Sequence, residues 1–258
     1  MNNRGIAARW GLIGILVGLI GGILFLYLGL RTLAGNPAPG TGPTSFVPQQ
    51  GVDVASRILD GGYILYFRHG NRVKWDSVIA FDVYETATGV DSREESFRDA
   101  VCLSPQGIEE AKMIGEIMEL GRVPVGFVAA SPSCRARETA EFAFARVDAI
   151  ETALVHTPVT SATNQATFTD ALGEFLRTVP MAADNNTFVM AHGNTLENHP
   201  ELFASGADWL REPFLLESGF YAISRSQDGK LAIEYQFTNL GEFAATVITL
   251  DPDVQDGP

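Results

Sequence analysis

The sequence is short of positive charge. Its 258 residues contain 18 Lys and Arg against 31 Asp and Glu, which gives a formal net charge of −13. Because nucleic-acid binding depends on a basic surface that neutralises backbone phosphates, this composition argues against a nucleic-acid partner. It leaves room for a small phosphorylated substrate, which responds mainly to the charges of its own pocket.

Histidine and cysteine are also scarce. The chain has four histidines and two cysteines, with no His-x-x-x-His or Cys-x-x-Cys pair. We therefore expect no metal ion, and no cofactor motif stands out. The two cysteines, Cys102 and Cys134, leave two alternatives open. They are two buried free thiols, or they form a disulfide in an oxidising compartment.

Charge is missing altogether from one stretch near the N-terminus. Residues 10–30 contain no charged side chain, and their number suits an apolar helix that crosses a bilayer. Arg4 and Arg9 precede this stretch, and Arg31 is the only basic residue close behind it. The positive-inside bias therefore predicts a cytoplasmic segment 1–9, a transmembrane signal anchor over 10–30, and the rest of the chain outside the cytoplasm, periplasmic or extracellular. The alternative is a cleaved signal peptide, which normally has a shorter apolar region and a clear cleavage site.

Two further features of the N-terminal region bear on its organisation. Gly14, Gly18 and Gly22 share one face of the expected membrane helix and would permit a dimer through close helix pairing, although glycine is also common in membrane helices generally. Residues 31–50 are rich in proline and glycine and predict a linker. Residues 51–258 then remain for a single folded domain.

Apolar runs alternate with helical patterns through this domain. The alternation predicts an α/β fold, a three-layer α/β/α domain with a mostly parallel sheet and an antiparallel hairpin near its end. Residues 73–101 form a long connection that we expect to be a partly helical lid. The expected strands are 63–67, 123–130, 149–155, 187–191 and the hairpin 220–223 with 231–235, and the expected helices are 52–59, 104–121, 134–145, 168–176 and 195–204.

Three of the expected strands end in polar motifs. RHGNR (68–72) follows the first strand, SPSCRARETA (131–140) follows the second, and AHGN (191–194) ends the fourth. The carboxyl ends of parallel strands lie at one edge of a sheet, where ligands bind in open α/β folds. We therefore expect the arginines and histidines of these motifs to lie together.

These motifs, together with LSPQGIEEA at 103–111, resemble the histidine phosphatase superfamily, the phosphoglycerate mutase and acid phosphatase group. The likeness spans roughly residues 60–225, with Glu110 where the family often has Gln. It implies a phosphomonoesterase that works through a phosphohistidine intermediate.

The resemblance also assigns roles to particular residues. His69 is the nucleophile it implies, Arg68 and Arg135 are the phosphate clamp, and a cationic His192 completes the pocket. Arg72 matches an additional pocket arginine of the acid phosphatase branch. Asn194 is either a donor to phosphate or a turn-stabilising residue.

The proton donor of the family is missing from its usual places. Residues 155–165 contain no carboxylate, and Gly193-Asn194 stands where the acid phosphatase branch has an acidic residue. Asp76 and Glu197 are the leading substitutes, with surface charge as the alternative for each. The absent acid also favours a second hypothesis, a catalytically weak or dead membrane-anchored domain that binds phosphate. For an external enzyme, we expect an envelope substrate such as a lipid- or glycan-linked phosphate.

Overall fold

The computed structural model describes residues 48–73, 95–155, 162–206, 208 and 214–250. The chain divides into two units, residues 1–46 and 47–258, and all the described residues belong to the second. The expected membrane segment 10–30, with Gly14, Gly18 and Gly22, and the candidate acid Asp76 lie outside the described residues. Among the helices of the described ranges, none has both the length and the apolar composition needed to cross a bilayer.

A six-stranded sheet forms the centre of the domain, with the strand order β3-β2-β4-β1-β5-β6. The first four strands in this order are mutually parallel, whereas β5 runs antiparallel to β1 and to β6. This confirms the predicted mostly parallel sheet with a terminal antiparallel hairpin. The strands are β1 (Ile64–Arg68), β2 (Val125–Ala130), β3 (Ala149–Ile150), β4 (Asn186–Ala191), β5 (Phe220–Arg225) and β6 (Leu231–Phe237).

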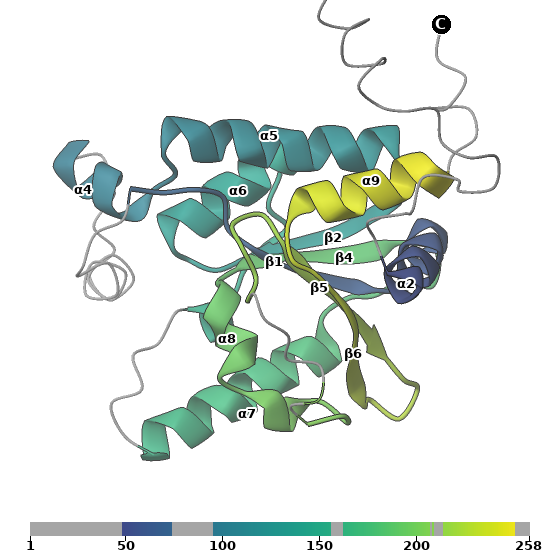
Figure 1. Ribbon diagram of the computed structural model, residues 1–258. Helices are drawn as coiled ribbons and strands as arrows, with labels where there is room; N and C mark the ends of the chain where they lie inside the picture. The colour runs from purple at the N-terminus through teal and green to yellow at the C-terminus, as the bar shows by residue number, and fades with distance from the viewer. Residues whose placement is uncertain (1–47, 74–94, 156–161, 207, 209–213, 251–258) are drawn as a thin grey trace, which may run out of the picture. The chain divides into compact units, whose positions relative to one another are not determined.

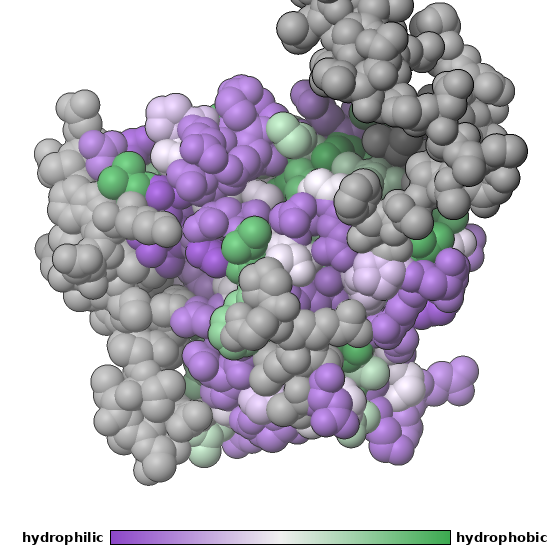
Figure 2. Space-filling view, in the orientation of Figure 1, coloured by the Kyte–Doolittle hydropathy of each residue, from purple (hydrophilic) through white to green (hydrophobic). Residues whose placement is uncertain are grey.

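Helices cover both faces of this sheet and complete the predicted three layers (Figure 1). On one face lie α2 (Gln49–Asp60), α5 (Pro105–Leu120), α6 (Cys134–Phe144) and α9 (Leu240–Leu250), and on the other lie α7 (Ala162–Thr178) and α8 (Gly193–Glu197). A short helix, α4 (Glu95–Val101), precedes α5, and 3₁₀ turns occur at Thr152–Leu154 and Pro200–Leu202. The outer face shown in Figure 2 is mostly hydrophilic, notably over α5.

The apolar run of β1 is explained by this sandwich. Successive side chains of a strand point to opposite faces. Leu65 and Phe67 accordingly join the core beneath α5 and α9, while Ile64 and Tyr66 join the core beneath α7. Both faces of the central strands are covered, so the run carries no polar alternation.

The structure differs from the sequence-based expectation in one strand and three helices. The strand expected over 149–155 is only Ala149–Ile150, because a 3₁₀ turn follows at Thr152–Leu154. The helix expected over 168–176 is longer, since α7 begins at Ala162. The helix expected over 195–204 is wrong in extent, because α8 ends at Glu197 and a 3₁₀ turn follows. Pro200 has no N–H to continue the helix and disfavours helical geometry at His199, whose φ and ψ are −131° and 52°. Helix α9 was not predicted. Its start carries a readable signal, since Asn239 Oδ1 accepts from Glu242 N and Glu242 Oε2 accepts from Thr238 N.

Candidate active site

The three polar motifs meet at the carboxyl edge of the parallel strands, as predicted. The His69 amide donates to the Ala191 carbonyl at 3.0 Å, and the Ser131 amide donates to the Met190 carbonyl at 2.9 Å. The rings of His69 and His192 lie edge to face with their centroids 5.5 Å apart. Strands β1 and β4, which carry these histidines, are neighbours, and the helices that follow them lie on opposite faces of the sheet. Ligands bind at such crevices in open α/β sheets.

His69 is held as a neutral ring with a defined tautomer. Its Nδ1 lies 2.7 Å from the Gly70 carbonyl oxygen, which can only accept, so Nδ1 carries the proton and Nε2 carries the lone pair. The side chain is buried, and this burial, together with the nearby positive charge of Arg135, lowers the pKa of His69 well below its usual value. The ring is therefore neutral at neutral pH, and its Nε2 is free of a proton.

Arg135 and His192 form the opposite wall of the site. Arg135 is only 2% exposed, although it lies in the first turn of α6. Its Nη2 donates to His192 Nδ1 at 3.2 Å, and His192 Nε2 lies 3.2 Å from Ser131 Oγ and 3.4 Å from Ser133 Oγ. A guanidinium cannot accept a hydrogen bond, so in this arrangement His192 is the neutral Nε2–H tautomer. The cationic form expected from the resemblance would require Arg135 to turn away from this ring.

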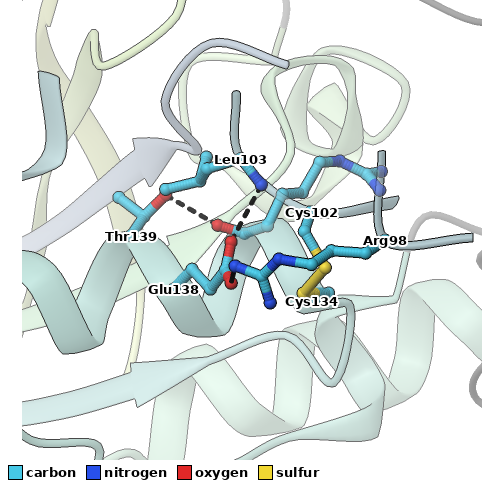
Figure 3. The surroundings of a disulfide bond; sticks show 7 residues. Arg98, Cys102, Leu103, Cys134, Glu138 and Thr139 are labelled. Atoms are coloured by element: carbon cyan, nitrogen blue, oxygen red, sulfur yellow. Dashed lines mark hydrogen bonds and ion pairs between the residues drawn. A yellow bond between two sulfur atoms is a disulfide. The ribbon is translucent and has the colours of Figure 1, made fainter. Parts of the chain in front are cut away.

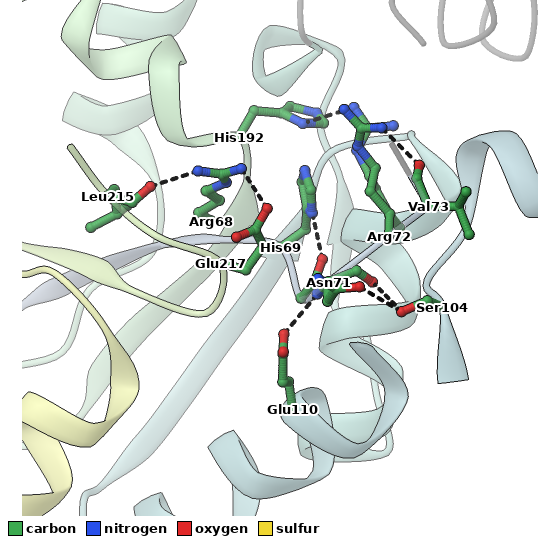
Figure 4. Close-up of polar contacts among 12 residues, drawn as sticks. Arg68, His69, Asn71, Arg72, Val73, Ser104, Glu110, His192, Leu215 and Glu217 are labelled. Atoms are coloured by element: carbon green, nitrogen blue, oxygen red, sulfur yellow. Dashed lines mark hydrogen bonds and ion pairs between the residues drawn. The ribbon is translucent and has the colours of Figure 1, made fainter. Parts of the chain in front are cut away.

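Arg68 lies at the edge of the site and is shared with a carboxylate. Its Nη1 donates to the Leu215 carbonyl at 2.7 Å, and its Nη2 forms an ion pair with Glu217 Oε1 at 2.7 Å. The view in Figure 4 places this pair on one flank of His69 and Arg72 on the other. Glu217 was not identified from the sequence.

The start of α5 fixes the loop that follows His69, which explains the LSPQG motif. Ser104 caps the helix by accepting from the Gly107 amide and also donates to Asn71 Oδ1 at 2.8 Å. The Asn71 amide donates to Glu110 Oε2 at 2.7 Å (Figure 4). A Cβ on Gly107 would lie 1.9 Å from the Asn71 carbonyl oxygen, so only glycine permits this approach.

Helix α6 holds the same loop from its other side. Thr139 Oγ1 donates to the Arg135 carbonyl at 2.7 Å and accepts from the Gly70 amide at 3.1 Å. One threonine thus links the backbone next to His69 to the helical turn that carries Arg135. This connection holds the backbone beside His69 close to that of Arg135.

The two cysteines form a disulfide beside Arg135, so the free-thiol alternative is wrong. Cys102 and Cys134 are bonded across a sequence separation of 32 residues, with their Cα atoms 4.8 Å apart. Glu138 accepts from the Leu103 amide at 2.9 Å and pairs with Arg98, so α4 and the start of α6 are also joined by polar contacts (Figure 3). Within the described residues, Cys102, Cys134 and Glu138 are the only group with the spacing of metal ligands, but both sulfurs are consumed by the disulfide.

The other candidates of the sequence analysis take different positions. Arg72 lies on the loop after His69, donates to the Val73 carbonyl at 3.0 Å, and adds to the positive charge that acts on His69. Asn194 is exposed in the first turn of α8. Glu197 accepts from Tyr221 Oη at 2.7 Å, so its carboxylate is directed to the buried tyrosines of β5 and β1.

The sequence did not indicate Glu217 because its position at the site depends on the direction of β5. Strand β5 is antiparallel to β1, and Phe220 at its start pairs with Phe67 near the end of β1. The residues that precede β5 therefore reach the same edge as the residues that follow β1. A sequence pattern shows a strand but not its direction, so the only available signal was the expected hairpin at the end of the sheet.

Comparison with known proteins gives structural likeness only. No family model and no curated protein matches the sequence. Among solved structures, the protein histidine phosphatase SixA complexed with tungstate is 16% identical, with a TM-score of 0.42 over 68% of this chain and 96% of that chain. Phosphoserine phosphatase from Entamoeba histolytica in complex with 3-phosphoglyceric acid is 11% identical, with a TM-score of 0.47 over 69% and 98%. A mycobacterial glucosyl-3-phosphoglycerate phosphatase is 14% identical, with a TM-score of 0.44 over 69% and 99%. These likenesses are distant.

Proposed function

We propose that the chain is a member of the histidine phosphatase superfamily and a phosphomonoesterase that works through a phosphohistidine on His69. The observation that carries the proposal is the state of His69. Its Nδ1–H donates to the Gly70 carbonyl, and its burial beside Arg135 keeps Nε2 unprotonated. A phosphorus atom is attacked by such a lone pair, and not by an imidazolium.

The surrounding charges suit phosphoryl transfer. Arg68 and Arg135 supply permanent positive charge for the equatorial oxygens of the transferring group, which spread their charge in the transition state. Amides in the first turn of α6 and the positive end of its dipole add to this field. His192 can donate to phosphate once Arg135 turns from its Nδ1 to a phosphate oxygen. No step of this reaction uses a metal ion or a cofactor.

The alternative function is a phosphate-binding domain with little or no turnover. It is favoured by the absence of the usual acid in residues 155–165 and after His192. The neutral nucleophile opposes it, because binding alone gives no reason to suppress the charge of a histidine in an anion site. A protonated His69 would bind phosphate more tightly than a neutral one.

The location of the enzyme is part of the proposal. We place residues 1–9 in the cytoplasm, a membrane anchor over 10–30, and the domain outside, where its substrate is a small or envelope-linked phosphate. The uncharged stretch and the Arg4 and Arg9 bias support this orientation, and a buried disulfide is typical of oxidising compartments. Protease added to spheroplasts should digest the domain. Protection until lysis would contradict the orientation.

The proposed phosphatase activity is tested by measuring phosphate release by the full chain in detergent. The wild type should hydrolyse nitrophenyl phosphate equally with and without a chelator. The variant His69→Asn keeps an amide for the Gly70 carbonyl but has no nucleophile, and its kcat should fall on the order of 10⁴-fold or more. The matched control is His199→Asn, a buried histidine bonded to Thr169 away from the site. Phosphate binding without turnover in the wild type would instead support the alternative.

A further inference from the structure

Among the described residues, the carboxylate of Glu217 forms an ion pair with Arg68, one of the two arginines of the proposed phosphate clamp. Its side chain is 24% exposed, and it lies 2.7 Å from Arg68. The leaving oxygen of a phosphomonoester needs a proton, and neither residues 155–165 nor the two positions after His192 hold a carboxylate. Glu151 directly follows β3, but it lines a hollow with Phe127 and Phe175 that includes none of the site residues. Glu217 is therefore a candidate on position alone.

The backbone ties Glu217 to the nucleophile as well as to the clamp. Residues 216–219 form a tight turn, in which the Gly219 amide donates to the Leu216 carbonyl at 3.0 Å. The next amide along from Glu217, that of Ser218, donates to the carbonyls of both Arg68, at 3.2 Å, and His69, at 3.3 Å. Glu217 is thus one residue removed from a direct hydrogen bond to His69. The backbone of Glu217 therefore cannot shift far without disturbing the end of β1.

Ser218 provides a second, independent sign that this turn is a functional element. Its φ is +62°, a left-handed conformation that favours glycine, yet the residue keeps a side chain. The side chain is only 3% exposed, and its hydroxyl has no hydrogen-bond partner among the described residues. Strained residues and unsatisfied buried polar groups gather at active sites, where a ligand completes them.

We propose that Glu217 is the general acid that protonates the leaving oxygen, a role that rests on the phosphatase activity proposed above. A bound phosphate competes with Glu217 for the Arg68 guanidinium. As Arg68 turns to the phosphate, the carboxylate loses its counter-ion and faces added negative charge, so it takes up a proton from solvent. Substrate binding thereby loads the acid.

The two steps balance as follows. In the first, the His69 Nε2 lone pair forms the N–P bond, the P–O bond to the leaving group breaks, and that oxygen takes its electron pair and the proton of Glu217 to leave as an alcohol. In the second, a water oxygen bonds to phosphorus while the Glu217 carboxylate removes one of its protons. The N–P bond breaks, its electron pair returns to Nε2, and inorganic phosphate is released.

A rival role for Glu217 is to hold Arg68 in place. The two roles respond differently to the leaving group, because an acid matters little for a nitrophenolate and much for an alkoxide. Gln at this position can still accept a hydrogen bond from Arg68, but its amide is not acidic enough to protonate the leaving oxygen. Asp keeps a carboxyl group on a shorter chain.

The test compares kcat and KM of the full chain in detergent for nitrophenyl phosphate and glycerol phosphate, in wild type, Glu217→Gln and Glu217→Asp. We expect Glu217→Gln to lower kcat/KM for glycerol phosphate by about 10²–10⁴-fold through kcat. Its activity on nitrophenyl phosphate should change only a few-fold, which also shows that the variant folds. Glu217→Asp should recover part of the glycerol phosphate turnover.

Two further variants complete the experiment. Glu234→Gln is the matched control. Glu234 is a half-buried carboxylate on β6 that pairs with Arg57 of α2, and this variant should leave kcat and KM for both substrates unchanged. Glu197→Gln tests the acid proposed from the sequence, and a selective loss of glycerol phosphate turnover there would overturn the assignment to Glu217. An equal loss for both substrates in Glu217→Gln would reduce Glu217 to a positioning residue for Arg68, and no loss would remove it from the reaction. A wild type without His69-dependent activity would instead defeat the phosphatase proposal itself.

Discussion

The two flanks of the site are built in different ways. On the side of α5 and α6, Thr139, Ser104 and Glu110 bind the loop after His69 to the helices. A disulfide joins the end of α4 to the start of α6, and Arg135 is buried. On the side of β5, Arg68 is 29% exposed and is shared with a carboxylate, beside a serine in a strained conformation. The first flank fixes the backbone beside His69 and the helical turn that carries Arg135, whereas on the second flank the proposed reaction requires Arg68 to exchange Glu217 for phosphate. Phosphoryl transfer needs both, because positioning must be rigid while the proton must move.

The largest predicted effect concerns the disulfide between Cys102 and Cys134, on the flank formed by α5 and α6. Replacing both Cys102 and Cys134 by Ser should lower the free energy of unfolding by about 3–4 kcal/mol in the chain-entropy model, since the bond closes a loop of 32 residues. Chemical denaturation measures the loss. We expect kcat/KM to fall less steeply, because Thr139 and Glu138 still hold α6. An unchanged midpoint would show that the flank does not depend on the bond.

Replacing each of the two proposed clamp arginines should lower kcat/KM by a different amount, because Arg135 is buried and Arg68 is partly exposed. Arg135→Lys should lower kcat/KM for nitrophenyl phosphate by about 10²–10³-fold, because a buried site with fixed donors loses a bidentate partner. Arg68→Lys should cost less, since that guanidinium is part-exposed and already divided between Glu217 and the Leu215 carbonyl. Steady-state kinetics of both variants makes the comparison. Equal losses would contradict the asymmetry.

The strained turn gives a smaller effect with two opposite signs. Ser218→Gly removes the cost of a side chain at positive φ and should raise the free energy of unfolding by about 0.5–1 kcal/mol, after the greater chain entropy of glycine is allowed for. It also removes the unpartnered hydroxyl, so kcat/KM should fall several-fold. Thermal unfolding and kinetics measure the two. A variant that gains both stability and activity would show that Ser218 serves no function.

The smallest effect is the contribution of His69 to the pH dependence of stability. Its pKa is lowered in the folded protein, chiefly by burial, so the folded state binds fewer protons than the unfolded state near the unfolded pKa of about 6.5. The contribution of the neutral ring to the free energy of unfolding is fully present above the unfolded pKa and is lost as the pH falls below it towards the folded pKa. Denaturation from pH 7 to pH 5 should therefore show a shallower slope in His69→Asn than in the wild type. Identical slopes would mean that the ring is not held neutral.

The fixed flank is also the part that the sequence predicted best. Apolar runs in the sequence predict where the strands end, at Arg68-His69, Ser131 and Ala191-His192. The start of α5 is predicted locally by its cap residue Ser104, which accepts from the Gly107 amide. The sequence-based prediction extends the helix after His192 to residue 204, although Pro200 disfavours a helix that continues through it. The extent of an element depends on such local punctuation.

The exchangeable flank was missed for a physical reason. Glu217 reaches the site because β5 runs antiparallel to β1, and direction is decided by pairing between residues about 150 positions apart. The choice between thiols and a disulfide likewise depended on whether α4 and α6 bring Cys102 and Cys134 together. Neither fact is encoded near the residues concerned. Contacts between distant segments determined what local patterns left open.

The central claim is that His69 receives the phosphoryl group, and trapping it is the most direct test. Full-length protein is mixed with phosphate-labelled nitrophenyl phosphate, quenched in alkali within milliseconds, and digested for mass spectrometry. We expect label that is stable to alkali and labile to acid, on the peptide that contains His69, and none in His69→Asn. Label on His192, or a wild type that turns over substrate without any trapped phosphohistidine, would contradict the account.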